Sequence, residues 1–349
     1  MAIGNQNNNT LTKNTMKKTA MALLSGPAQI MFQPSATTGV LFLAGILWGA
    51  VTSGHAEVAL GAVVGLVVST LTGYILGLPH DEGEVGLWGF NGTLMGIAIL
   101  TFLRSSPVTW VALVLSSAMT TWVRTGLNNI SSAHGINSLT FPFVLCSWLF
   151  LASSRIFAGL DGVALSHPML PAIHLSDWAA TAPTSVWEAV EWPLRGIGQI
   201  MLQDSWVSGA LFLVGLLVSS PRAALWAFIG SAIGTYGAIW MGGSTVAVES
   251  GLYGFSPALT AIALGAVFYP ASPGSTLWAL LGTLATIFVQ GATNIFLEPL
   301  GLPALTAPFC LTTWLFLLPR IAIGSHHTTT PSPPPDHSNW HKPKAESRA

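Results

Sequence analysis

The chain has 349 residues, of which 51% are hydrophobic and only 7% are charged. A soluble domain carries roughly 25% charged residues, so this composition excludes an ordinary water-soluble protein and indicates an integral membrane protein. The 12 Lys and Arg residues against 13 Asp and Glu residues leave no basic face for a nucleic acid. Cys146 and Cys310 both lie inside apolar runs, which favours buried small side chains over a disulfide or a metal site.

Polar segments divide the chain into parts. Residues 1–20 contain three lysines and no clear cleavable signal pattern, so we expect a polar cytoplasmic tail. Two apolar regions follow, 21–154 and 195–323, and the linker between them (155–194) has the acidic residues and prolines of an irregular connection outside the membrane. Residues 324–349 are rich in proline and should form a disordered cytoplasmic tail. The tail histidines could bind a metal in principle, but a solvated tail explains them better, and we expect no metal or cofactor.

Ten apolar runs approach the length of a membrane span. They cover residues 36–54, 57–78, 86–103, 106–124 and 137–154 in the first half, and 206–220, 223–241, 251–270, 275–295 and 302–323 in the second. A spanning helix needs about 17–25 apolar residues, so we predict an all-α protein with ten transmembrane helices. The segments 21–34 and 193–204 are apolar but too short to span, and we predict that each is a re-entrant pore helix.

Basic residues indicate the orientation, because an even number of spans puts both termini on one side. If that side is the cytoplasm, nine basic residues are inside and only Arg104, Arg155 and Arg195 face out. The nine are Lys13, Lys17, Lys18, Arg124, Arg222, Arg320, Lys342, Lys344 and Arg348. This distribution follows the positive-inside rule. We therefore expect a multi-pass protein of the plasma membrane, the inner membrane in a bacterium, with both termini cytoplasmic.

The two halves carry the same three motifs in the same order. SGPAQIMFQ at 25–33 matches RGIGQIMLQ at 195–203, with an offset of 170 residues. GLWGFNGTL at 86–94 matches GLYGFSPAL at 251–259, and GINSLTFPF at 135–143 matches GLPALTAPF at 301–309, with offsets of 165 and 166. Each half has an odd number of spans, so the two copies must be inverted relative to each other. Inverted repeats place solute sites near the membrane midplane, where both copies contribute each motif.

Each motif supplies a different kind of side chain. Gln29 and Gln199 are uncharged groups suited to bonding a neutral polar solute, although glutamine also bonds membrane helices to each other. Phe90 and Phe255 share a helix face with Leu94 and Leu259, and Phe32 adds a third ring near Gln29. Opposed rings would form a flat slot for a thin planar molecule. The alternative is ordinary core packing.

The third motif places a threonine two residues before a proline, at Thr140 and Thr306. Proline removes a backbone donor and frees the carbonyl one turn earlier, so oxygen atoms can gather beside the threonine hydroxyl. A row of acceptors suits a molecule rich in N–H groups. The alternative is a proline kink capped by its own threonine. Carboxylates such as Glu57, Glu82 and Glu298 fall near span ends or in loops, so we expect no charge at the site and passive movement of a neutral solute.

At these motifs the chain resembles the urea transporter family, over residues 21–323. The family's repeated Leu-Pro-x-x-Thr-x-Pro-Phe stretch is intact at 302–309 and has Asn137 in place of the first proline in the other copy. Its Gly-x-x-Gly-Phe-Asn motif is intact at 86–91 and altered to GLYGFS at 251–256. The resemblance implies passive, channel-like diffusion of urea through the bilayer and a homotrimer with one pore in each protomer.

The resemblance also implies a role for each matching residue. Gln29 and Gln199 would bond urea at the two mouths, and Thr140 and Thr306 would supply the central hydroxyls. The remaining pore positions would be the rings Phe32, Phe90 and Phe255, the aliphatic walls Leu94 and Leu259, and the backbone neighbours Ile30 and Ile200. Leu202 departs from the pattern, because many members have a ring there, as Phe32 is in the first half. The second slot is then wider.

Three other functions remain open from the residues. The first is a passive channel for other small neutral amides, ammonia or water, for which Leu202 would widen the slot. An ammonia channel would be expected to carry histidines within its spans, whereas His55 and His134 lie at span ends. The second is an ion-coupled secondary transporter, against which the missing buried charge argues. An enzyme is disfavoured, because no nucleophile, base and orienting group converge in any motif.

Overall fold

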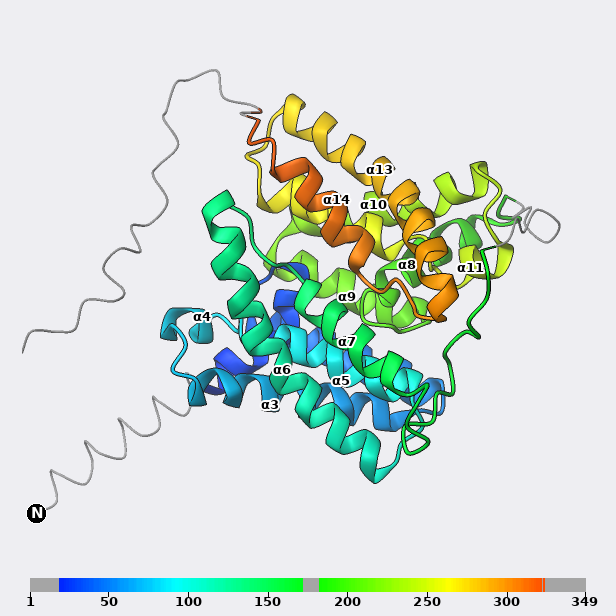
Figure 1. The fold of residues 1–349 in the computed structure, drawn as a ribbon. Helices are drawn as coiled ribbons and strands as arrows, with labels where there is room; N and C mark the ends of the chain where they lie inside the picture. Colours follow the sequence, from blue (N-terminus) through cyan, green and yellow to red (C-terminus); the bar gives the residue numbers. More distant parts are fainter. Residues whose placement is uncertain (1–18, 172–181, 322, 324–349) are drawn as a thin grey trace, which may run out of the picture.

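Helices are the main secondary structure of the described part of the chain. The computed structural model describes residues 19–171, 182–321 and 323, and within them the pairing of extended backbone is limited to one isolated bridge between Leu103 and Gly162 (Figure 1). Large apolar side chains such as Ile75, Val111 and Phe288 are exposed on the outer surface. An apolar surface of this kind is covered by lipid or by protein in the cell. The two predicted tails, 1–20 and 324–349, lie almost entirely outside the described residues.

Both halves contain the same series of α-helices, and the second half has an additional π-helical segment over Ala263–Val267. The first half has a helix over Thr19–Met31 that ends in η1 (Gln29–Met31), then α2 (Ala36–Thr52), α3 (Ala56–Ile75), α4 (His80–Glu84), α5 (Phe90–Phe102), α6 (Pro107–Ser131), η2 (Ser132–His134) and α7 (Phe141–Ser153). The second half has α8 (Val186–Gln199), α9 (Trp206–Ser219), α10 (Pro221–Trp240), α11 (Thr245–Glu249), α12 (Phe255–Ile262), η3 (Ala263–Val267), α13 (Pro273–Leu297), η4 (Glu298–Leu300) and α14 (Ala307–Leu317). The predicted linker 155–194 is therefore helical from Val186 onward.

Local sequence explains where several of these helices begin. Ser35 and Ser205, at matching positions of the two halves, cap α2 and α9 by accepting a backbone hydrogen bond. Ser106 and Ser272 cap α6 and α13 in the same way, and a proline follows each of them in the first turn. Serine at the N-cap and proline in the first turn are the preferred residues at these positions, because they satisfy or remove unpaired N–H groups.

The two halves hold each other through reciprocal contacts between α2 and α9. Thr38 Oγ1 donates to the carbonyl oxygen of Gly215 at 2.9 Å, and its counterpart Ser208 Oγ donates to the carbonyl oxygen of Gly45 at 2.8 Å. Between these bonds the rings of Phe42 and Phe212 meet edge to face with centroids 5.2 Å apart. When residue i of one copy contacts residue j of the other and the reverse also holds, a two-fold relation connects the copies.

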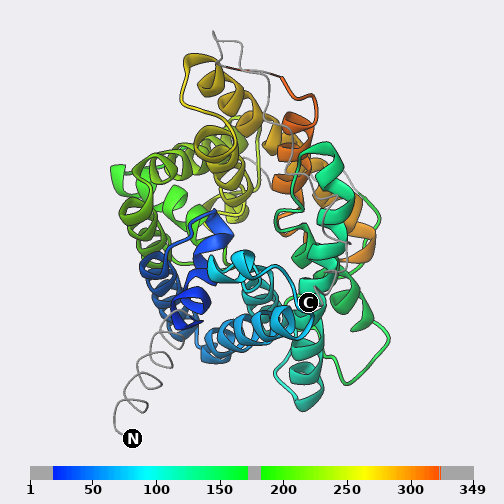
Figure 2. The same cartoon turned by 90° about the vertical axis from the view of Figure 1, so that its left-hand side faces the viewer.

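A second set of reciprocal contacts joins α7 and α14. Trp148 Nε1 donates to the carbonyl oxygen of Pro303, and Trp314 Nε1 donates to that of Asn137, each at 2.9 Å. Figure 2 shows the two contact regions on opposite sides of the molecule, with blue α2 beside green α9 at the left and teal α7 beside orange α14 at the right. The motif residues are thus enclosed between two symmetric seams.

Four of the predicted spans are shorter than expected. The helices α5, α7, α12 and α14 begin at Phe90, Phe141, Phe255 and Ala307, because the motif residues before them form turns. A helix of about 13 residues rises only about 20 Å, less than the roughly 30 Å of a hydrocarbon core. Among the described residues, three helices are long and apolar enough to cross a membrane, or four if the pair Thr19–Met31 and Ala36–Thr52, bent by 71°, is one broken span. Ten crossings stay a prediction.

Candidate functional site

A first cavity lies where the helix over Thr19–Met31 ends against the loop that precedes α5. Its volume is about 170 Å³. It is lined by Gln29, Ile30, Phe32, Glu82, Leu87, Phe90, Arg124, Asn128, Asn137, Ser138, Leu139 and Thr140. The structure therefore brings together five of the predicted site residues of the first half, from three motifs far apart in the sequence.

A second cavity occupies the corresponding place in the other half. Its volume is about 190 Å³. It is lined by Phe102, Phe143, Gln199, Ile200, Leu202, Leu252, Phe255, Gln290, Asn294, Pro303, Ala304, Leu305 and Thr306. Five predicted residues of the second half meet here. Both cavities are smaller than the roughly 300–1,000 Å³ of a pocket for a drug-sized ligand, so they suit a small solute.

The two predicted threonines join the walls of these cavities. Thr140 lines the first cavity and Thr306 the second, and their Oγ1 atoms are 2.7 Å apart, so one hydroxyl donates to the other. Both side chains are buried, and the Sγ atom of Cys310 lies 3.4 Å from Thr140 Oγ1. Each threonine is the counterpart of the other, so this bond lies on the two-fold relation between the halves.

The expectation that each proline frees a carbonyl oxygen one turn earlier is wrong, and so is the alternative of a proline kink capped by its own threonine. Pro142 and Pro308 fall in the first turn of α7 and α14, with Thr140 and Thr306 as the N-cap residues. A proline at a helix start frees no carbonyl of an earlier turn, because that turn does not exist. Neither threonine side chain caps its own helix. The two hydroxyl groups bond to each other instead.

Two residues in each cavity wall have a left-handed backbone conformation. Phe32 and Leu202 have φ values of 62° and 54°, and Leu139 and Leu305 have φ values of 54° and 51°. Bulky residues rarely adopt this left-handed region, and such strain persists only where surrounding contacts impose it. Phe32 caps η1 through a bond from its N–H to the Gln29 carbonyl oxygen, and Leu202 N bonds Gln199 O in the same way. The left-handed backbone of Phe32 and Leu202 turns the chain sharply after each glutamine.

The two glutamines make the same backbone contact. Gln29 Nε2 donates to the carbonyl oxygen of Val85 at 2.7 Å, and Gln199 Nε2 donates to that of Ser250 at 2.9 Å. The amide nitrogen therefore serves as a bond between segments, as the packing interpretation expected. The carbonyl oxygen of each side chain is then the atom that can accept an N–H group from a solute in the cavity.

The aromatic rings are partly different from those expected. Phe32 meets Phe268 and Phe309 edge to face, with centroids 5.8 Å and 6.2 Å away, and both partners belong to the second half. In the second cavity, Phe102 and Phe143 of the first half lie in the wall with Leu202. Sequence analysis missed these partner rings. The signal for Phe143 and Phe309 was present, because each ends a repeated motif.

The predicted aliphatic walls are not among the side chains that line either cavity. Leu94 and Leu259 are fully buried in the apolar core, one turn into α5 and α12. Ile30 and Ile200 do line the cavities, although their side chains are buried. The role of Leu94 and Leu259 as walls of the path stays a prediction.

The expectation that no charge lies at the site is wrong for the first cavity. Arg124 and Glu82 both line it, and Arg124 Nη1 donates to Glu82 Oε2 at 2.8 Å. The predicted span ended at residue 124, but α6 continues to Ser131, which places Arg124 within the helix and buries it. Its counterpart in α13, at an offset of 166 residues, is Gln290 in the wall of the second cavity.

Comparison with known proteins gives a consistent result. The family model described as urea transporter matches residues 8–321. The chain belongs to the urea transporter family. Urea transporter 1 of Ovis aries is 30% identical over 299 residues, which cover 85% of this chain and 76% of the relative. Urea transporter 1 of Rattus norvegicus is 30% identical over 303 residues, with the same coverage. Membership places the chain among membrane transporters, not enzymes.

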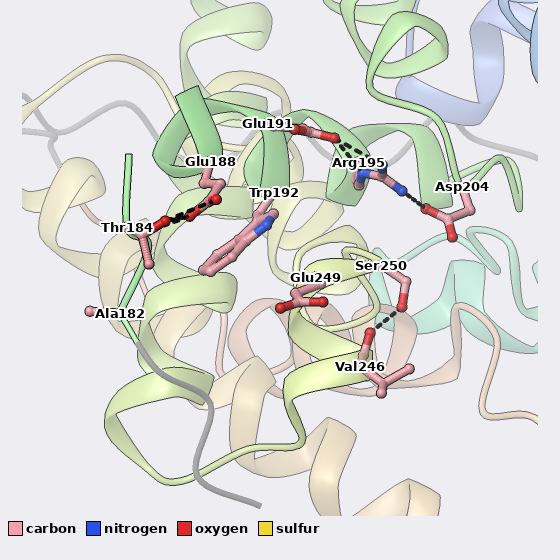
Figure 3. A pocket seen from close by; sticks show the side chains of 10 residues that line it. All are labelled: Ala182, Thr184, Glu188, Glu191, Trp192, Arg195, Asp204, Val246, Glu249 and Ser250. Carbon is pink, nitrogen blue, oxygen red and sulfur yellow. Dashed lines mark hydrogen bonds and ion pairs between the residues drawn. The ribbon is translucent and has the colours of Figure 1, made fainter. Parts of the chain in front are cut away.

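A further pocket among the described residues lies outside the site that the family motifs define. This pocket, of about 470 Å³, is polar and open to the surface, and adjoins the second cavity through Ser250 (Figure 3). Three of its charged side chains form ion pairs, since Arg195 bonds Glu191 at 2.8 Å and Asp204 at 2.7 Å. Hydrogen bonds from the backbone and side chain of Thr184 lower the pKa of the Glu188 carboxyl.

Proposed function

We propose that this protein carries urea passively across the membrane, along a path from the first cavity through the Thr140–Thr306 pair to the second cavity. The observation that carries the proposal is the hydroxyl pair itself, because it joins two small cavities built from the same three motifs. The family model and the relatives named urea transporter 1 support urea as the solute.

The chemistry of the path fits a flat molecule with four N–H donors and one carbonyl oxygen. At each mouth a glutamine carbonyl oxygen accepts an N–H group while urea loses water between apolar side chains. At the centre, Thr140 and Thr306 exchange their mutual hydrogen bond for bonds to the solute, so the desolvated molecule keeps partners throughout. A weak partner at each step lets the solute leave as readily as it binds.

The proposed architecture is ten transmembrane helices and two re-entrant helices in two inverted five-helix repeats around one pore. The reciprocal contacts of α2 with α9 and of α7 with α14 support it, because an inverted repeat requires a two-fold relation between the copies. The short helices α5, α7, α12 and α14 fit the same arrangement. Their motif ends meet at the cavities, where irregular backbone is shielded from lipid by protein.

The assembly and the location are further parts of the proposal. Exposed apolar side chains on the outer helices suit both lipid and protein neighbours, and we propose a homotrimer with one pore in each protomer. The excess of basic residues on one side supports a plasma membrane protein, in a bacterium the inner membrane, with both termini in the cytoplasm. Crosslinking in the membrane and labelling of cysteines added at each end of the full chain would test these two points.

Urea flux from proteoliposomes tests the function. The purified full chain is reconstituted, and urea efflux is followed by stopped-flow light scattering beside empty vesicles. We expect channel-like urea efflux well above that of empty vesicles, and it should need no ion gradient. Efflux no faster than in empty vesicles would refute the proposal.

The same vesicles distinguish the alternatives. Ammonia, water, formamide and acetamide are compared with urea in parallel, and equal permeation of all would favour an unselective pore. Among the described residues, the Arg124–Glu82 pair in the first cavity bears on ion coupling, since such carriers use charges at the site. Because Arg124 and Glu82 are bonded to each other, we expect neither to take up a coupling ion, and urea flux should be unchanged when a proton or sodium gradient is imposed.

A further inference from the structure

The first cavity contains a cation held against an aromatic ring. The side chain of Arg124 is 8% exposed, and its guanidinium carbon lies 6.0 Å from the centroid of the Phe90 ring. The carboxylate of Glu82, which accepts the hydrogen bond from Arg124, is 31% exposed. Both side chains and the ring line the cavity, so a solute there is close to all three.

The second cavity has no such charge among its lining residues. Gln290 occupies the position of Arg124, and its amide nitrogen donates to the carbonyl oxygen of Leu252. Asn294 corresponds to Asn128, so the helix register is the same in both halves. Glu82 corresponds to Ala247 at the offset of 165 residues that relates the neighbouring motifs. The two cavities share their glutamine and threonine but differ in charge.

The shared groups do not distinguish urea from guanidinium. Guanidinium is also planar and rich in N–H donors, so carbonyl and hydroxyl acceptors suit it as well. Phenylalanine faces attract cations, which would favour guanidinium further. A pore lined only by these groups would therefore need another feature to reject a planar cation of the same shape.

Arg124 supplies that feature through its position. Its side chain is more buried than that of Glu82, so water screens the positive charge less than the negative one, and a cation beside the ring would be repelled more by Arg124 than it is attracted by Glu82. Its guanidinium group also occupies the side of the Phe90 ring to which a permeating cation would otherwise bind.

We propose that Arg124 is a specificity-determining residue, which admits neutral planar amides to the first cavity and excludes planar cations such as guanidinium. The inference rests on the proposed function, because it concerns selectivity along the same path. Glu82 accepts a hydrogen bond from Arg124, but the selectivity rests on the positive charge of Arg124 and does not require the ion pair. Gln290 gives the second cavity no comparable selectivity.

The test compares uptake of radiolabelled guanidinium with efflux of urea in proteoliposomes of the full chain. For Arg124→Gln, which reproduces the residue of the second cavity, we expect the ratio of guanidinium to urea permeability to rise at least about tenfold. Arg124→Lys keeps the charge and should keep the wild-type ratio within about twofold. Glu82→Gln breaks the same ion pair but leaves the cation, so its ratio should stay at or below that of the wild type.

Two controls keep the outcome decisive. Arg124→Gln leaves the Glu82 carboxylate unpaired, so the double variant Glu82→Gln/Arg124→Gln, which leaves no unpaired charge, replaces it if the single variant does not fold. An unchanged ratio in that double variant, with urea flux preserved, would overturn the inference while the proposed function stands. Equal changes in Arg124→Gln and Glu82→Gln would also overturn it, since a merely structural ion pair predicts that result. If the wild type passes no urea, the proposed function itself fails.

Discussion

The two cavities are built on one plan, and among the side chains in which they differ are a ring and an ion pair. Both have a glutamine bonded to a backbone carbonyl, a strained residue after it and a threonine at the inner end. The first has Phe32 where the second has Leu202, and it has the Arg124–Glu82 pair where the second has Gln290 and Ala247. The shared glutamine and threonine supply acceptors for a neutral, N–H-rich solute along the whole path. The ring and the ion pair, which the cavities do not share, can act at one mouth only.

Removal of the central hydroxyls should have the largest effect, because it destroys the element that the cavities share. In the double variant Thr140→Val/Thr306→Val the shape is kept but the acceptors are lost, so a desolvated solute has unpaired N–H groups at the centre. Each unpaired group costs about 1–3 kcal/mol, and we expect urea flux to fall about tenfold to a hundredfold. Stopped-flow efflux from proteoliposomes measures it.

Thr283→Val is the matched control for this variant. Thr283 is equally buried, but its hydroxyl bonds the carbonyl oxygen of Ala279 within the same helix, away from the lining of both cavities. Its flux should stay within about twofold of the wild type. Unchanged flux in the threonine pair variant would mean that Thr140 and Thr306 have only a packing role.

The sequence predicts which motif residues lie together, because each motif occurs in both halves. Three motifs at nearly constant offsets require equivalent surroundings, and an odd number of spans in each half requires inversion, so Gln29, Thr140 and Thr306 were expected at one place. The all-helical fold follows from apolar runs alone. None of this reasoning needs the position of a single side chain.

The exact helix starts and the charged mouth could not be predicted in this way. Hydrophobicity does not reveal that Leu139 and Leu305 adopt left-handed backbone, which delays α7 and α14 and moves Pro142 to a first turn. It also does not show how far α6 continues past Arg124. Partner rings such as Phe268 come from the opposite half, and only the three-dimensional arrangement selects them.

Substitution at the glutamines tests whether the two mouths are equivalent. Gln29→Met and Gln199→Met each remove one acceptor for the solute and one bond to the carbonyl of Val85 or Ser250. A hydrogen bond contributes about 1 kcal/mol, so we expect each variant to lose about fivefold in urea flux. Losses that differ by more than an order of magnitude would show that one mouth controls the flux, which contradicts the equivalence.

An exchange of Phe32 and Leu202 tests the difference in slot width. Phe32→Leu removes the ring that contacts Phe268 and Phe309, and Leu202→Phe adds a ring near Phe102 and Phe143. We expect the permeability ratio of methylurea to urea to rise about threefold in the first variant and fall about threefold in the second. The double exchange serves as the control, because it moves the ring to the other half and should restore a ratio close to that of the wild type.

Cys310→Val should have the smallest effect, although Cys310 contacts the centre of the path. Its sulfur lies 3.4 Å from Thr140 Oγ1, but the hydroxyl already has Thr306 as a stronger partner at 2.7 Å. The counterpart of Cys310 in the first half is Val144, so the first half already has valine at this position. We expect urea flux within about twofold of the wild type. A tenfold fall would mean that the sulfur is itself a partner of the solute, and that the centre of the path is asymmetric as well as its mouths.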